Sequence, residues 1–348
     1  MPRMDARGFA GEIRKNRLSG AYFLYGSELY LLDRYLERFL QRAVPGMAAF
    51  NLQRFEAGKG TLDWGALEDA VQNLPMMAER KVVLLHDPDP EKLAADELKR
   101  LQKLVEELPE TTLLVVYITG FALSVKGNRK TQNFITFFEK HGTAVEFAPL
   151  SKNDLAKYLS DTAAKSGCFL PQTLADRMIE YCGVELTALL QNLEKVVAFT
   201  GKGEVQPEAV ENLVEKTMDA TAFDLANALM RGNLPGALDA VAELKAQRVE
   251  PIMVAGALNS AFLDLYRAKC ALAAGKRIPE MTEDFSYNPK VRFRVENAFR
   301  SAGKMDTEAL RRGIRLLHRL DLELKSSRAD PFELLEETLV RIHAGDEG

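Results

Sequence analysis

The sequence predicts an α/β domain with a central parallel sheet, followed by helical domains. Three observations support this fold class. The first part of the 348-residue chain alternates short β-rich runs with amphipathic segments. Two of the runs, residues 82–85 and 113–118, consist almost entirely of Val, Leu, Ile and Tyr, which is typical of strands buried on both faces of a parallel sheet. After Pro149 the strand pattern stops and helical periodicity takes over.

Five strands are expected in the first domain. They span residues 21–25, 52–56, 82–85, 113–118 and 144–147. Amphipathic helices are expected between them, for example over residues 29–39, where Leu32, Leu36 and Phe39 lie at helical spacing. Strands that alternate with helices indicate βαβ units. We therefore place a three-layer domain at residues 1–148.

A small helical domain is expected over residues 149–216. Ser151, with Asp154 three residues later, forms a capping box for its first helix. Pro171 is placed in the first turn of the second helix, where its missing N–H costs nothing. Leucines and valines at helical spacing predict two further helices, joined by a loop over residues 200–204.

A second helical domain is expected over residues 217–348. Its helices are predicted at residues 223–230, 237–247, 252–274, 291–302 and 307–325, with a last helix ending near residue 343. Residues 276–289 are polar and contain proline, so they are interpreted as a connector. Asp330 and Pro331 are the expected N-cap and first-turn residue of the last helix.

The charge, the cysteines and the apolar runs of the chain argue against several classes of protein. The chain carries 46 Lys and Arg against 50 Asp and Glu, a net charge of -4, which argues against strong autonomous binding to nucleic acid. Three scattered cysteines, Cys168, Cys182 and Cys270, form no metal or disulfide motif and are interpreted as small buried hydrophobic residues. No signal-peptide run and no apolar stretch of membrane-spanning length is present, so a cytoplasmic protein without a membrane partner is expected.

No site for catalysis or for a cofactor is predicted. A phosphate loop needs glycines and a Gly-Lys pair after the first strand, but the chain has only Gly26 there, and Glu28 has the wrong charge. His86 and Asp87 end a buried strand, where enzymes often place acids and bases, but without a phosphate loop they are interpreted as a solvated strand end. We find no metal-ligand set and no nucleophile motif.

One apolar segment precedes the third predicted strand. It reads Leu74-Pro75-Met76-Met77, and Pro75 limits continuation of the preceding helix, so the methionines could be pushed outward on a turn. Unbranched methionine adapts well to a partner's groove. The alternative is that these residues belong to the core, as most Met and Leu residues do.

Two basic clusters are candidate DNA contacts. Lys126, Arg129 and Lys130 form the first. Arginines on neighbouring turns of one predicted helix form the second, namely Arg311, Arg312, Arg315 and Arg319. The alternative for both clusters is a solvated face, because surface charges usually need no partner.

Five stretches of the chain resemble the delta subunit family of bacterial DNA polymerase III, the clamp-opening subunit of the clamp loader. They are Tyr22–Glu28 with Leu31-Leu32, Leu74–Val83, Cys182–Leu186 with Asn192–Lys195, residues 223–238, and Asp321–Lys325 before Asp330-Pro331. Each stretch is short, but the five follow the family's order and spacing over nearly the whole chain.

The resemblance implies an AAA+-like first domain, a helical lid and a helical collar used for oligomerisation. It implies that the chain opens the sliding clamp (beta) without hydrolysing ATP, through Leu74, Met76 and Met77. The family commonly has an aliphatic–aromatic pair where this chain has Met76-Met77. Further implied partners are the gamma/tau ATPase subunits, delta-prime and primer–template DNA. Polymerase (nucleotidyltransferase) activity would belong to the assembled complex.

Two other functions stay open on the sequence. One is an AAA+ ATPase with a divergent nucleotide site, which nucleotide titration would reveal. The other is a clamp-loader-like scaffold that serves a different assembly, which co-purification would reveal.

Overall fold

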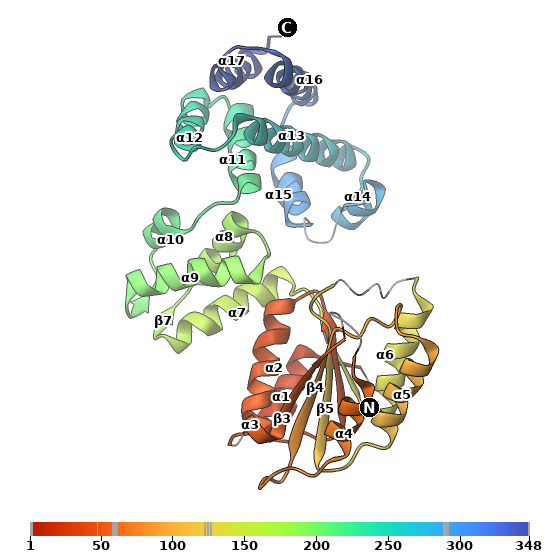
Figure 1. Ribbon diagram of the computed structural model, residues 1–348. Coiled ribbons are helices and arrows are strands. Elements are labelled where there is room, and N and C mark those ends of the chain that lie inside the picture. Colours follow the sequence, from red (N-terminus) through yellow and green to blue (C-terminus); the bar gives the residue numbers. More distant parts are fainter. Residues whose placement is uncertain are drawn as a thin grey trace. The chain divides into compact units, whose positions relative to one another are not determined.

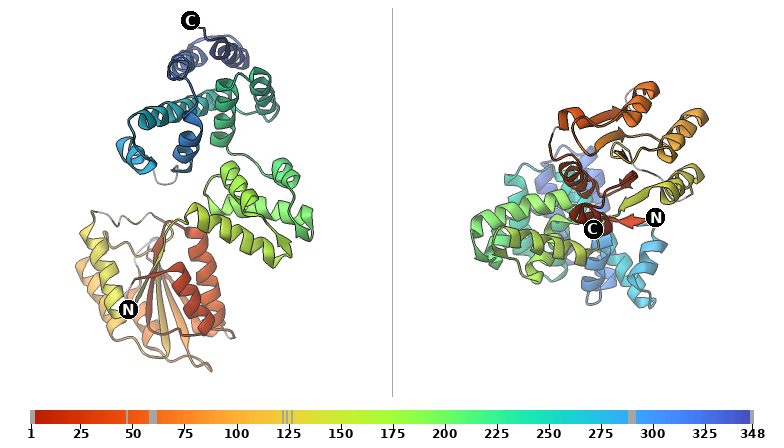
Figure 2. Two further views of the ribbon diagram at one scale, coloured as in Figure 1. Left: turned by 180° about the vertical axis from the view of Figure 1, so that it is seen from behind. Right: turned by 90° about the horizontal axis from the view of Figure 1, so that it is seen from below.

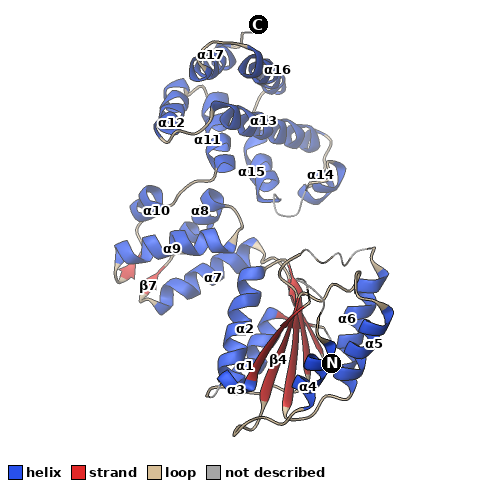
Figure 3. Cartoon of the chain, viewed as in Figure 1, coloured by secondary structure: helices blue, strands red, loops and turns tan. Residues whose placement is uncertain are grey.

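The computed structural model describes residues 3–46, 48–57, 62–121, 123, 125, 127–287 and 292–346 (Figure 1). The chain divides into two compact units, Met1–Leu150 and Ser151–Gly348. The first unit is the α/β part of the chain and the second is mainly helical (Figure 3). The predicted fold class is therefore confirmed.

The first unit is built on a parallel sheet with the strand order β1-β6-β2-β5-β4-β3. Its strands are β1 (Met4–Asp5), β2 (Ala21–Gly26), β3 (Leu52–Glu56), β4 (Lys81–His86), β5 (Thr112–Tyr117) and β6 (Thr143–Phe147). Its helices are α1 (Ala6–Lys15), α2 (Leu29–Ala43), α3 (Ala48–Asn51), α4 (Trp64–Gln72), α5 (Ala95–Glu106) and α6 (Arg129–His141). Helices α1 and α2 cover one face of the sheet, and α4, α5 and α6 cover the other (Figures 1 and 2).

Apolar side chains of β2 point alternately to the two faces of the sheet, so both faces need a layer of helices. The Tyr22 ring packs against Phe39 of α2, with ring centroids 5.1 Å apart. The next residue, Phe23, points to the opposite face and packs against Phe134 of α6 at 5.0 Å. Because successive side chains on a strand point to opposite faces, this central strand is apolar throughout and buried on both sides.

All five predicted strands are present, and the edge strand β1 was missed. It has only two residues, Met4 and Asp5, which are too few to show a period of two. Asp5 also serves as the N-cap of α1, where its side chain accepts a hydrogen bond from the Gly8 N–H.

The second unit is helical apart from one short strand pair. Its helices are α7 (Lys152–Lys165), α8 (Gln172–Cys182), α9 (Leu186–Thr200), α10 (Pro207–Leu213), α11 (Met218–Met230), α12 (Leu234–Ala246), α13 (Pro251–Ala273), α14 (Ile278–Asp284), α15 (Arg292–Ala302), α16 (Thr307–Ser326) and α17 (Pro331–Ala344). The capping predictions at Ser151 and Asp330 are confirmed, since both side chains accept hydrogen bonds from the backbone of the following turn.

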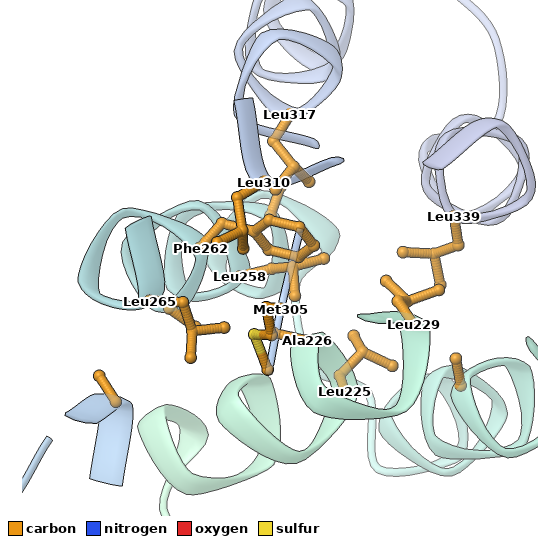
Figure 4. Close-up of a cluster of buried hydrophobic side chains, with 14 of the residues drawn as sticks. Leu225, Ala226, Leu229, Leu258, Phe262, Leu265, Met305, Leu310, Leu317 and Leu339 are labelled. Carbon is orange, nitrogen blue, oxygen red and sulfur yellow. The ribbon is translucent and has the colours of Figure 1, made fainter. Parts of the chain in front are cut away.

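One core of this unit surrounds α13 (Figure 4). Phe262 of α13 is fully buried, and Leu310 and Leu317 of α16 pack in the same cluster. Gly313 permits the close approach of α16, because a Cβ at this position would lie 2.4 Å from the Phe262 ring.

The predicted division of the chain into three domains, with boundaries at residues 149 and 217, stays a prediction.

Four local predictions in the second unit were wrong. Strands also occur after Pro149, because β7 (Cys168–Phe169) pairs in parallel with β8 (Gly203–Glu204). Strand β8 lies inside the loop predicted at residues 200–204. The predicted connector 276–289 contains the helix α14. Pro171 is the N-cap of α8 and not a first-turn residue. Cys270 is exposed, whereas Cys168 and Cys182 are buried as expected.

Candidate functional site

The segment between α4 and β4 presents three large apolar side chains to solvent. Leu74 is 83% exposed, Met76 54% and Met77 86%. The alternative that these residues belong to the core is therefore excluded. We call Leu74, Met76 and Met77 the apolar tip.

Asn51, the last residue of α3, holds the apolar tip by two hydrogen bonds. The Met76 N–H donates to Asn51 Oδ1 at 2.7 Å, and Asn51 Nδ2 donates to the Met76 carbonyl oxygen at 2.9 Å. The side chain of Asn51 is buried, so these bonds are shielded from water. A single amide thus satisfies both backbone groups of the residue at the centre of the tip.

Lys81 fixes the start of the same segment. Its ammonium is buried and donates to the carbonyl oxygen of Ala70 at 2.6 Å, and also to that of Asn73, so it caps the C-terminal end of α4. Burial lowers the pKa of Lys81. On the other side, Arg80 donates to the Leu18 carbonyl oxygen at 3.2 Å. The segment is therefore tied to the fold before, within and after the tip.

The backbone of Met77 adopts a left-handed conformation, with φ of 49°. A left-handed conformation costs a non-glycine residue about 1–2 kcal/mol. The turn that carries the most exposed side chain of the tip is thus held in an unfavourable conformation by its anchors.

Phe50 adds a fourth apolar side chain that the sequence analysis missed. It is 61% exposed and immediately precedes Asn51, so its ring is presented from the segment to which the tip is tied. In the sequence Phe50 resembles an ordinary core residue next to a strand. The pairing of β3 with β4 and the contact between Asn51 and Met76 bring the two segments together.

No phosphate loop fits between β2 and α2. Only Ser27 and Glu28 connect the strand to the helix. The Glu28 N–H donates to the Phe147 carbonyl oxygen at 3.0 Å, so this amide is directed at β6. Gly26 has φ of 141°, and a Cβ there would lie 2.1 Å from the Phe147 carbonyl oxygen. Glycine is therefore needed here so that the end of β2 can lie close to β6.

His86 and Asp87 form a structural link and not a solvated strand end. Asp87 Oδ1 accepts hydrogen bonds from the N–H groups of Thr119 at 2.8 Å and Gly120 at 3.0 Å. His86 Nε2 lies 2.7 Å from Thr119 Oγ1, and the His86 ring stacks on Tyr117. The two side chains join the ends of β4 and β5.

The two described members of the first basic cluster, Arg129 and Lys130, lie at the carboxyl edge of the sheet, away from the apolar tip at the amino edge. Arg129 and Lys130 are exposed in the first turn of α6, and Lys130 Nζ donates to the Glu91 carbonyl oxygen at 3.0 Å. Lys126 lies outside the described residues. In the second cluster Arg311 is engaged by Tyr266 and Glu308, whereas Arg315 and Arg319 are exposed.

Within the described part of the chain, no group of three or more His, Cys, Asp or Glu residues could hold a metal ion. No helix in that part is long and apolar enough to cross a membrane. The geometry of the described residues thus defines a class of protein, an α/β domain on a parallel sheet whose β2–α2 connection is too short for a phosphate loop and whose α4–β4 segment presents a fixed apolar tip.

Comparison with known proteins gives the family. Residues 22–148 match the model "DNA polymerase III, delta subunit", and residues 219–342 match "DNA polymerase III delta subunit, C-terminal domain". The chain belongs to the DNA polymerase III delta subunit family. The resemblance drawn from the five sequence stretches is therefore confirmed.

Individual relatives agree with this assignment. DNA polymerase III subunit delta of Bacillus subtilis is 23% identical over 339 residues, covering 95% of this chain and 94% of its own length. The solved structure of the Bacillus subtilis DNA clamp loader delta protein has a TM-score of 0.66 at 20% identity and covers 97% of this chain and 99% of its own. A gamma subunit-related protein of Thermotoga maritima, at 12% identity over 97% of this chain and 98% of its own, has a TM-score of only 0.33.

Proposed function

We propose that this chain is the non-catalytic subunit of a DNA polymerase III clamp loader that binds and opens the sliding clamp. The observation that carries the proposal is the apolar tip. Three large apolar side chains are exposed together, and buried anchors hold their backbone in place. Exposed apolar groups of this kind mark protein-binding surfaces, and a fixed backbone reduces the entropy lost on binding.

Burial of the tip contributes favourable free energy to a contact with the clamp. Complete burial of a Leu or Met side chain contributes about 1.5–3 kcal/mol. Scaled by the exposed fractions of Leu74, Met76 and Met77, their burial in a pocket of the clamp provides about 3–7 kcal/mol. Methionine fills a pocket less rigidly than an aromatic ring, so we expect the exposed Phe50 to supply the aromatic contact.

The remaining partners follow from the same role. The helical part after residue 217 would hold the chain beside the gamma/tau ATPase subunits and delta-prime, which hydrolyse or respond to ATP in its place. Binding of ATP in those neighbours would expose the tip to the clamp. Arg129 and Lys130, with Lys126, are proposed to approach primer–template DNA in the assembled complex. The setting is the cytoplasm.

Met77→Asp tests the proposal directly. The change places a charge on the most exposed side chain of the tip, so we expect binding to the sliding clamp of the same organism to be abolished while the circular dichroism spectrum and Tm stay unchanged. Met253→Asp is the matched control, because Met253 is also an exposed methionine but lies on α13. Unchanged clamp affinity of Met77→Asp in surface plasmon resonance would refute the proposal.

A further inference from the structure

A groove lined by arginines runs between α1 and α2 in the first unit. Four of its lining residues are Arg7, Arg14, Arg38 and Arg42, and none of its lining residues is acidic. Its volume is about 640 Å³. The chain as a whole carries a net charge of -4, so this groove concentrates positive charge against the overall balance.

The sequence spacing places these arginines on two facing stripes. On α1, Arg7 and Arg14 are two turns apart, about 10 Å along the axis, with Gly11 between them. On α2, Arg38 and Arg42 are one turn apart. Figures 1 and 2 show α1 and α2 side by side on the same face of the sheet. The guanidinium groups therefore line both walls of one channel.

Three of these arginines are not neutralised by the protein. Arg14, Arg38 and Arg42 are exposed and form no ion pair with any residue that the structure describes. Arg38 instead lies over the Tyr35 ring, 5.6 Å from its centroid. The nearby acidic residues Glu12 and Glu37 share these helices but do not line the groove.

We propose that the α1–α2 groove binds the phosphodiester backbone of single-stranded DNA. Guanidinium groups match phosphate oxygens in geometry and stay charged at any physiological pH. A groove of about 640 Å³ has room for a short stretch of one strand and not for a duplex. This site is separate from the apolar tip and from the basic clusters discussed above.

Gly11 offers a substitution that changes the groove and spares the fold. A Cβ at Gly11 meets no atom within 4 Å, and the residue lies in the interior of a helix, where glycine is less stable than other residues. Gly11→Glu therefore places a negative charge on the floor of the groove without steric conflict. Gly11→Gln is its uncharged counterpart of the same length.

Fluorescence anisotropy with labelled oligothymidylate measures the affinity of the full chain. For phosphate contacts at Arg14, Arg38 and Arg42, log K is expected to fall with log salt with a slope of about -2.1. Arg14→Glu with Arg42→Glu removes two of these contacts, which reduces the slope to about -0.7 and the affinity about 25-fold at about 0.1 M salt. We expect Gly11→Glu to weaken binding likewise and Gly11→Gln to leave it within a few-fold of the wild type.

Arg231→Glu with Arg328→Glu in the second unit is the control, since it makes the same change in net charge at two other exposed arginines, which lie outside both basic clusters. The proposal is overturned if this control weakens binding as much as the groove variants, if neither does, or if no binding is detected at about 50 mM salt. Tighter binding of duplex, or equal competition by polyglutamate, also overturns it. Gly11→Glu retains clamp binding, which separates a failure here from a failure of the proposed function.

Discussion

Replacement of Asn51 by alanine isolates the contribution of a fixed tip to clamp binding. Asn51 is buried and holds Met76 through two hydrogen bonds, so it is a positioning residue. Each bond contributes about 0.5–1.5 kcal/mol, so Asn51→Ala is expected to lower the free energy of unfolding by about 1–3 kcal/mol. For a unit of this size each kcal/mol lowers Tm by about 2–4 °C.

The effect of Asn51→Ala on the affinity for the clamp is entropic. Once released, the backbone of Met76 must be ordered again on binding, at a cost of about 1–2 kcal/mol, which weakens the affinity for the clamp about 5- to 30-fold. The side chains of the apolar tip are unchanged in this variant. Surface plasmon resonance on immobilised clamp gives the Kd, and differential scanning calorimetry gives Tm.

Asn192→Ala is the matched control. Asn192 is also buried, donates to the Ala188 carbonyl oxygen and accepts from the Glu215 N–H, each at 3.0 Å, but it lies in the second unit. It is expected to reduce stability to a similar extent with no effect on the Kd for the clamp. The account of a pre-ordered tip is refuted if Asn51→Ala binds the clamp within twofold of the wild type, or if Asn192→Ala weakens binding equally.

Three further predictions use other parts of the chain. Ellman's reagent at pH 8 is expected to react fast with one thiol, that of Cys270, because Cys168 and Cys182 are buried. Burial also raises the pKa of Cys182 to about 11. Two or three fast-reacting thiols would contradict this prediction. Gly26→Ala is expected to lower Tm steeply because its Cβ would overlap the Phe147 carbonyl oxygen; an unchanged melting curve contradicts that packing. ATP with magnesium is expected to leave the Tm of the isolated chain unchanged, and a nucleotide-dependent rise contradicts the missing phosphate loop.

The strands that sequence predicted were those with a strong local pattern. Residues 82–85 and 113–118 are apolar without a break, because both faces of β4 and β5 are covered by helices. By contrast, β1 and the β7–β8 pair are two residues long and carry no period. The sequence does not predict α14 although Glu280 accepts from the Arg277 N–H at its start, because a proline such as Pro279 in a polar segment is typical of a connector as well as of a first helical turn.

The candidate site was predictable only in part, for a physical reason. The exposed residues Met76 and Met77 follow a proline, which is a local signal. Their anchor, Asn51, is 25 positions away from Met76 along the chain, and its role depends on α3 and the α4–β4 segment meeting in space. The neighbouring ring of Phe50 is recognisable as part of a surface only once that contact is known.

The central claim is that this chain binds the sliding clamp by itself and without nucleotide. Sedimentation velocity on the purified chain mixed with the sliding clamp of the same organism, in the absence of ATP, tests it most directly. We predict a complex that sediments faster than either component and that is lost when Leu74, Met76 and Met77 are all replaced by serine. Two unshifted boundaries for the wild-type chain, or a complex that survives the triple replacement, would contradict the account.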